Sequence, residues 1–232
     1  MDTFTRSSAC DNCNVKCLFA NADEGSDAVN GTSYRREIRF NKGETVFKHG
    51  SFNTSVVFVK RGLLKQFMEG YHSNKNLIVR FYSPGDYLGL SEVFGRNEIK
   101  YTVTALNPCD VCLIEINQAK KILAKDQSLY EILFRHFNRE NDFLYYRLGV
   151  MGTKNLQGRM AEAITYISQL EKKGLDIYPN ITRKELAELA GMSVESMIRL
   201  LNEFKHDRLI NIDGKILVIN NMEMMKILCR VG

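Results

Sequence analysis

The sequence contains no apolar run close to the ~18 residues that a membrane-spanning helix needs. Residues 1–20 also lack the order of a signal peptide, in which basic residues precede an apolar stretch. These absences predict a cytoplasmic protein that does not contact membranes. Cytoplasmic thiols stay reduced, so the six cysteines favour metal or redox chemistry over structural disulfides.

Signatures of common enzymes are missing too. The sequence has no Gly-x-Ser-x-Gly, no P-loop and no Gly-x-Gly-x-x-Gly. Its four histidines stand alone, with no His-x-His pair to hold a metal on neighbouring strands. We therefore predict that the chain is not an enzyme. A cupin-like metalloenzyme with His49 and His72 as ligands is the weaker alternative.

The pattern of apolar residues and glycines changes near residue 116. Before it, β-branched and aromatic runs such as VVFVK, LIVRFY and YTVTAL alternate with glycine-bearing turns, which indicates an antiparallel β-sandwich. From Asn117 glycine is absent until Gly149, and apolar residues recur at helical spacing. A long amphipathic helix needs a partner for its apolar stripe. We expect its N-terminal piece to pack on the sandwich and the rest to pair with a second copy. The alternative is two helices, broken near residues 125–128, that both pack on the sandwich.

Residues 180–206 carry the pattern of two helices joined by a tight turn. Thr182 and Glu185 form a Thr-x-x-Glu capping box, which satisfies free backbone N–H groups at a helix start. Gly191 ends this short helix, and Ser193 caps the next one after a turn of about three residues. This arrangement is typical of a helix-turn-helix.

The second helix is predicted to have one buried face and one polar face. The expected buried stripe follows a three-four spacing and consists of Val194, Met197, Ile198, Leu201 and Phe204. The polar residues expected to contact DNA bases are Glu195, Ser196, Arg199 and Asn202. A carboxylate can accept from the cytosine amino group, and a guanidinium can donate to guanine O6 and N7. The alternative is that Glu195 and Arg199 form an ordinary i,i+4 salt bridge on a solvated face.

A hairpin follows the second helix directly. Asp213–Gly214 separates two strand-like runs, LINI and KILVIN, which is a strong hairpin signal. A helix-turn-helix with such a hairpin is a winged helix, and it predicts double-stranded DNA as a partner. The residues expected to contact the DNA backbone are Thr182, Arg183, Lys184, Ser193, Lys205 and Lys215.

The order of a β-sandwich, a long helix and a winged helix resembles the CRP/FNR family of bacterial transcription regulators. FNKGETVFKHG and SPGDYLG are similar to its glycine-marked turns, and ITRKELAELAGMSVESMIRLL with GKILVI to its reader helix and wing. The resemblance implies an α+β fold with a jelly-roll, cyclic-nucleotide-binding-like sandwich, and a homodimer that reads a palindromic site and contacts RNA polymerase. Glu195 and Arg199 match the family residues that contact the G·C pair of a TGA-type half-site. Val194 fits the FNR branch, whereas Ile198 departs from the serine typical of that branch. The domain prediction is a cysteine-containing arm 1–37, a sandwich 38–116, a connecting and dimerisation helix 117–152, and a winged helix 153–232.

The resemblance also directs attention to what the sandwich senses. Cyclic-AMP-binding members use a Gly-Glu pair on the ribose and an Arg-Ser pair on the phosphate. The matching residues here are Gly89 and Leu90, and Lys100 and Tyr101. Leucine cannot pair with a ribose hydroxyl, and lysine cannot make the bidentate fork of arginine. We therefore do not expect cyclic AMP to bind, although these residues stay candidates for another small effector.

The segment CDNCNVKC places three cysteines near the N-terminus. With Cys112 in the sandwich, Cys10, Cys13 and Cys17 resemble the four thiolate ligands of the [4Fe–4S] cluster in the FNR branch. The spacing here is Cys-x2-Cys-x3-Cys, whereas the FNR branch has Cys-x2-Cys-x5-Cys. Four thiolates suit Zn²⁺ as well. Free or disulfide-forming thiols are the remaining alternative.

Overall fold

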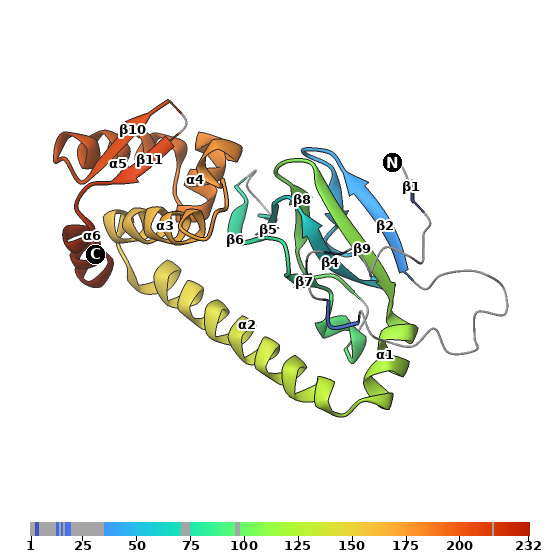
Figure 1. The fold of residues 1–232 in the computed structure, drawn as a ribbon. Coiled ribbons are helices and arrows are strands. Elements are labelled where there is room, and N and C mark those ends of the chain that lie inside the picture. Colours follow the sequence, from blue (N-terminus) through green and yellow to red (C-terminus); the bar gives the residue numbers. More distant parts are fainter. Residues whose placement is uncertain are drawn as a thin grey trace. The chain divides into compact units, whose positions relative to one another are not determined.

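The computed structural model describes residues 3–4, 13, 15, 17–19, 35–70, 75–95, 98–214 and 216–232. The chain divides into two compact units, one of Met1–Gln66 with Phe81–Asn141, the other of Phe67–Arg80 with Asp142–Gly232. Figure 1 labels their elements along the chain. Within the described ranges, no helix has the length and apolar character to cross a membrane.

Two sheets form a β-sandwich, most of which lies in the first unit, although residues 67–68 and 77–80 of its strands fall in the second. Its strands are β1 (Thr3–Phe4), β2 (Arg35–Phe40), β3 (Thr45–Phe47), β4 (Ser55–Arg61), β5 (Leu64–Met68), β6 (Leu77–Tyr82), β7 (Tyr87–Leu88), β8 (Thr102–Ala105) and β9 (Cys109–Glu115). One sheet has the order β1-β2-β9-β4-β7, and the other has the order β3-β8-β5-β6. Strand β9 pairs antiparallel with β2 and β4, which makes it central in its sheet.

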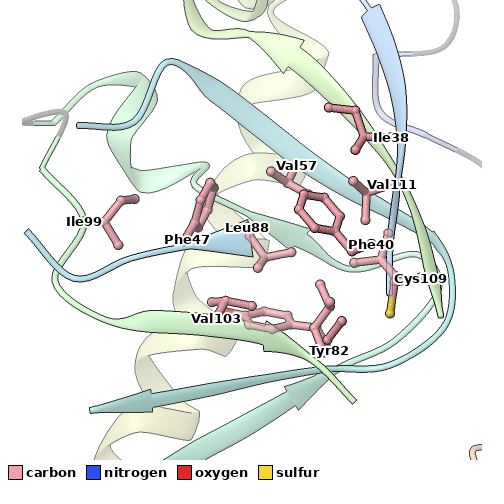
Figure 2. Close-up of a cluster of buried hydrophobic side chains, with 13 residues drawn as sticks. Ile38, Phe40, Phe47, Val57, Tyr82, Leu88, Ile99, Val103, Cys109 and Val111 are labelled. Atoms are coloured by element: carbon pink, nitrogen blue, oxygen red, sulfur yellow. The ribbon is translucent and has the colours of Figure 1, made fainter. Parts of the chain in front are cut away.

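The space between the two sheets is filled by apolar side chains. Val57, Val111 and Phe40 from one sheet lie opposite Val103 and Tyr82 from the other, as Figure 2 shows. The alternation of β9 explains this arrangement, because Cys109 and Val111 enter this interior and Cys112 points to the opposite face of the sheet. The interior therefore has the packing of a sandwich core.

The outer face of the five-stranded sheet is covered by helices and by the N-terminal segment. The covering elements are the 3₁₀ helix η3 (Ser91–Val93), helix α1 (Ile116–Lys125), the start of α2 (Ser128–Thr153) and residues 15 and 17–19. Ala119 and Leu123 of α1 are buried in this second cluster. The helical conformation is interrupted between α1 and α2. There the Asp126 carboxylate accepts from the backbone N–H (2.9 Å) and the hydroxyl (2.7 Å) of Ser128. Residues 117–152 therefore form two helices, the first of which packs on the sandwich.

The second unit contains the winged helix. Its elements are α3 (Leu156–Glu171), η4 (Tyr178–Asn180), α4 (Arg183–Ala190), α5 (Val194–His206), β10 (Ile210–Asp213), β11 (Ile216–Ile219) and α6 (Met222–Val231). Strands β10 and β11 pair antiparallel, with Asp213 opposite Ile216 across the turn. Gly214 has φ +56° there, a backbone conformation that glycine adopts without strain. The predicted α+β fold is confirmed.

Candidate nucleic-acid interface and sensory segment

Local side-chain chemistry fixes the two helices of the helix-turn-helix. The Thr182 hydroxyl accepts from the Glu185 N–H at 3.1 Å, and the Glu185 carboxylate accepts from the Thr182 N–H at 2.6 Å. This reciprocal capping box starts α4 as the sequence predicts. Gly191 ends α4 with φ +63°, and the Ser193 hydroxyl then caps α5 by accepting from the Ser196 N–H at 3.2 Å. The turn angle between α4 and α5 thus rests on these caps and on one left-handed glycine.

Contacts with α2 and α3 hold these helices in the second unit. The buried Arg147 side chain of α2 donates to the Leu189 carbonyl at 2.7 Å, at the C-terminal end of α4. A cation is favourable there because the free carbonyl groups make that end negative. On α3, the Gln157 amide donates to the Glu203 carboxylate of α5 at 2.6 Å. Both helices are therefore fixed by polar contacts as well as by their apolar faces.

One residue of α5 lies on a different face from the predicted one. The buried residues are Met197, Leu200, Leu201 and Phe204, whereas Val194 is half-buried and Ile198 is 42% exposed. The prediction that Ile198 belongs to the buried stripe is therefore wrong. Leu200 takes its place, because Met197, Leu200 and Phe204 also follow a three-four spacing and lie opposite the polar face.

The polar face of α5 presents the four residues that the sequence predicts for base contacts. Glu195, Arg199 and Asn202 are exposed, and Ser196 is half-buried with its hydroxyl 3.2 Å from that of Ser193. Glu195 and Arg199 form no salt bridge with each other, although both lie in the described part of the chain. The structure thus does not support the alternative of an ordinary i,i+4 pair.

Groups at the start of α5 favour the ionised form of the Glu195 carboxyl group. Its own backbone N–H and the Ser193 hydroxyl form hydrogen bonds to the carboxylate, and these lower the pKa of Glu195. The group therefore stays ionised at neutral pH and acts as an acceptor only. Arg199 is a donor only, so the two side chains present complementary chemistry to a C·G or G·C base pair.

The predicted backbone-contacting residues flank this face. Arg183, Lys184 and Lys205 are exposed, with the Lys184 ammonium 3.8 Å from the Glu188 carboxylate. Thr182 and Ser193 lie at the starts of α4 and α5, where their hydroxyls cap the helices. Lys215 of the wing lies outside the described residues.

Three of the four predicted cysteine ligands have described positions, and these lie on one side of the sandwich. Cys17 and Cys112 pack against the apolar cluster on the outer face of the five-stranded sheet, and Val15 packs there too. The Cys13 thiol donates to the Val15 carbonyl at 3.3 Å. The Leu18 N–H donates to the Tyr87 hydroxyl, and the Arg35 guanidinium donates to the Phe19 carbonyl. These contacts hold the segment against the sheet. Cys10 lies outside the described residues.

A half-buried ion pair lies near Cys13 and Cys112, and sequence reasoning did not anticipate it. The Lys60 ammonium is 2.9 Å from the Glu37 carboxylate. Burial acts to lower the pKa of Lys60, but the hydrogen bond to Glu37 and the negative charges of Cys112, Glu37 and Cys13 raise it. No local sequence signal indicates this grouping, since it depends on the pairing of β2, β4 and β9.

The donor chemistry of these thiols fits an iron–sulfur cluster or Zn²⁺, but their described arrangement is not yet a coordination site. Among the residues that the structure describes, no group of three or more His, Cys, Asp or Glu side chains is close enough to hold a metal ion. Cys109 does not belong to this set. It is buried between the sheets, and burial raises the pKa of its thiol to about 11.

The residues considered for a small effector differ in their burial and contacts. Leu90 is 3% exposed and packs in the cluster on the outer face of the five-stranded sheet. Gly89 (φ +74°) approaches Asn53 and Phe47 so closely that a Cβ atom there would lie 2.5 Å from the Asn53 amide nitrogen. Lys100 is exposed and pairs with Glu98 at 2.7 Å, and Tyr101 packs against the core between the sheets. Gly89 and Tyr101 thus both lie next to Phe47, whereas Leu90 packs on the outer face of the five-stranded sheet and Lys100 is exposed.

Comparison with known proteins agrees with this architecture. Residues 37–126 match the family model of the cyclic nucleotide-binding domain, and residues 158–228 match that of the Crp-like helix-turn-helix domain. An anaerobic regulatory protein of Aggregatibacter actinomycetemcomitans is 24% identical over 92% of this chain and 84% of its own length. The fumarate and nitrate reduction regulatory protein of Vibrio cholerae is 22% identical over 94% of this chain and 89% of its own length.

Solved structures have the same fold. FixK2 from Bradyrhizobium japonicum superposes with a TM-score of 0.71 at 18% identity, covering 83% of this chain and 96% of its own. The fold, the two family matches and the related regulators define this chain as a DNA-binding transcription regulator and not an enzyme. It belongs to the CRP/FNR family.

Proposed function

We propose that this protein is a cytoplasmic homodimer that reads a palindromic DNA site with α5 and responds to a redox signal through its N-terminal thiols. The proposal of DNA reading rests on the polar face of α5, where Glu195 and Arg199 are exposed and form no salt bridge with each other. As a transcription regulator that reads promoters, it would act on RNA polymerase.

The proposed homodimer rests on an exposed stripe of α2. Phe134, Asn138, Asn141, Tyr145 and Leu148 alternate in steps of four and three, which is the heptad spacing of a coiled-coil seam. All five are exposed in the single chain, and Phe134, Tyr145 and Leu148 are each 66–68% exposed. Large apolar side chains in such a row need a partner surface, and a second copy of α2 offers an identical one. The two asparagines would fix the register of the pair.

A dimer explains why the site is expected to be a palindrome. Two copies of α5 related by a two-fold axis read two inverted half-sites about one helical turn apart. Each α5 presents one carboxylate and one guanidinium, which suit a single C·G or G·C pair per half-site. A TGA-type half-site provides such a pair.

Variants of α5 test this proposal directly. Glu195→Ala and Arg199→Ala, made in the full chain, should each lose about 1–3 kcal/mol of discrimination against a changed G·C pair in a TGA-containing palindrome. Lys205→Ala is the matched control, because a backbone contact should weaken binding equally on all sequences. Fluorescence anisotropy with matched and changed duplexes measures both effects. Unchanged discrimination in both Glu195→Ala and Arg199→Ala would rule out base reading by α5.

For the signal, we propose the thiols as the sensing groups. Cys17 and Cys112 pack on one side of the sandwich, Cys13 and Cys112 lie near Lys60, and Cys10 would supply the fourth thiol of the set. A [4Fe–4S] cluster held by these four residues would supply one-electron redox chemistry at this surface. The sheet contributes Cys112, and the Lys60 ammonium would offset part of the negative charge of the thiolates. The packing of Leu90 and Gly89 gives less support to a small effector bound within the sandwich.

Metal and sulfide analysis tests the cluster. After anaerobic reconstitution, the wild-type chain should contain about four iron and four sulfide per chain. Cys112→Ser should lose most of this content, whereas Cys229→Ser, which changes a half-buried thiol of the second unit, should keep it. Zinc without sulfide would indicate a structural Zn²⁺ site instead. A wild-type chain free of iron and zinc that still binds its DNA site would rule out both metals.

A further inference from the structure

Ile198 is an apolar residue on the DNA-reading face of α5. It follows Glu195 by three positions and precedes Asn202 by four, so the three side chains lie on one side of the helix. Its 42% exposure means that the second unit does not cover it, whereas its neighbours Met197 and Leu200 are buried. Single exposed apolar residues are common on protein surfaces. This one differs because the exposed side chains around it, Glu195, Arg199 and Asn202, are charged or polar and would face the groove that the helix enters.

The chemistry of the major groove offers one apolar target. Among the four bases only thymine presents a methyl group there, and apolar side chains recognise it by contact. Isoleucine has no hydrogen-bonding group, so it cannot select a base by donors or acceptors. On this basis, which rests on the proposed function, we propose that Ile198 contacts the methyl group of a thymine adjacent to the base pair that Glu195 and Arg199 read.

The spacing along the helix sets which thymine this is. Residues rise about 1.5 Å each along an α-helix, so Ile198 lies roughly 4.5 Å from Glu195 and 1.5 Å from Arg199 along the axis. Successive base pairs are about 3.4 Å apart along the duplex. The contacted thymine is therefore expected about one step from the pair that Glu195 and Arg199 read.

Neighbouring side chains leave this role to Ile198. Ser196 carries the other small polar group near the helix start, but its hydroxyl is within hydrogen-bonding distance of Ser193 and its side chain is half-buried. Ile198 instead has a β-branched side chain with few rotamers in a helix, which presents its methyl groups in a defined direction. A contact with a methyl group needs only such a fixed apolar surface.

Replacing thymine by deoxyuridine removes the methyl group and leaves every hydrogen-bonding group in place. With the full chain and its selected palindrome, this change at the contacted thymine should weaken binding about fourfold for one half-site and about fifteenfold for both, as expected for one methyl group each. Ile198→Ala should bind the thymine and deoxyuridine duplexes equally and should still prefer the G·C pair. Met224→Ala, which truncates a comparably exposed apolar residue on α6 (41% exposed), is the matched control and should keep the deoxyuridine effect.

The possible results separate this inference from the proposed function. A wild-type chain that selects no DNA sequence contradicts the proposed function, and the inference with it. If a site is selected and the G·C preference depends on Glu195 and Arg199, the proposed function stands. The inference about Ile198 is then overturned if no thymine of the half-site is sensitive to deoxyuridine, or if Ile198→Ala shows the same sensitivity as the wild type.

Discussion

Replacing Leu148 by alanine should weaken self-association of the chain strongly. Leu148 is 68% exposed at the exposed stripe of α2, and the proposed dimer buries it against a second copy. The change removes three carbon groups, and burying each one fully contributes ~0.8 kcal/mol. Because about two thirds of the side chain is exposed before association, the dimer should lose about 1.6 kcal/mol of binding free energy per chain. Both chains of a two-fold dimer lose the contact, which gives about 3 kcal/mol and a roughly 100-fold higher dissociation constant.

Sedimentation velocity over a dilution series measures this dissociation constant. Ile132→Ala is the matched control, because Ile132 is 45% exposed on the opposite side of the same helix. It should leave the dissociation constant within about twofold, since changes at exposed positions away from an interface are worth about 0.5 kcal/mol or less. If Leu148→Ala associates as tightly as the wild type, or if both variants weaken association equally, the stripe is not the interface.

Three further predictions concern α4, the DNA backbone and the sandwich core. Thr182→Ala removes the hydroxyl that caps α4 and should lower the stability of this helix by about 1 kcal/mol. Hydrogen exchange of the α4 amides should then be roughly fivefold faster, and unchanged exchange would contradict the role of the cap. Arg183→Gln and Lys205→Gln should each reduce the slope of log affinity against log salt by ~0.9 without changing sequence preference, which binding titrations at several salt concentrations can check. Burial raises the pKa of Cys109 to about 11, so the folded chain keeps a proton that the unfolded chain loses above pH ~8.5. The stability should therefore fall by about 2–3 kcal/mol between pH ~8.5 and 11, and urea unfolding of Cys109→Ala should lack this fall.

Local signals predicted the winged helix well. The Thr182–Glu185 capping box, the left-handed Gly191 and the Asp213–Gly214 turn all occur as the sequence indicates. Each depends on residues a few positions apart, and their chemistry allows few alternatives. The break between α1 and α2 was harder to predict, because it depends on the Asp126 contacts with Ser128 as well as on helical spacing.

The predictions that were wrong or missing concern features that depend on packing or on pairing between distant parts of the chain. Ile198 and Leu200 are both apolar at positions compatible with a three-four stripe, and only the packing of α5 within its unit exposes one and buries the other. The Lys60–Glu37 pair lies near Cys112 because β2 and β4 both border β9, and no short sequence pattern carries that information. Spacing along a chain indicates the face of an element, but its neighbours come from the fold.

The most direct test of DNA reading is a competition between two duplexes for the full-length chain at fixed salt. One duplex carries the palindrome selected from random DNA, and the other carries the same bases with both half-sites scrambled. We expect a preference of about 10³-fold or more for the palindrome, as is typical of specific over non-specific binding. Equal affinity for the two duplexes would contradict it.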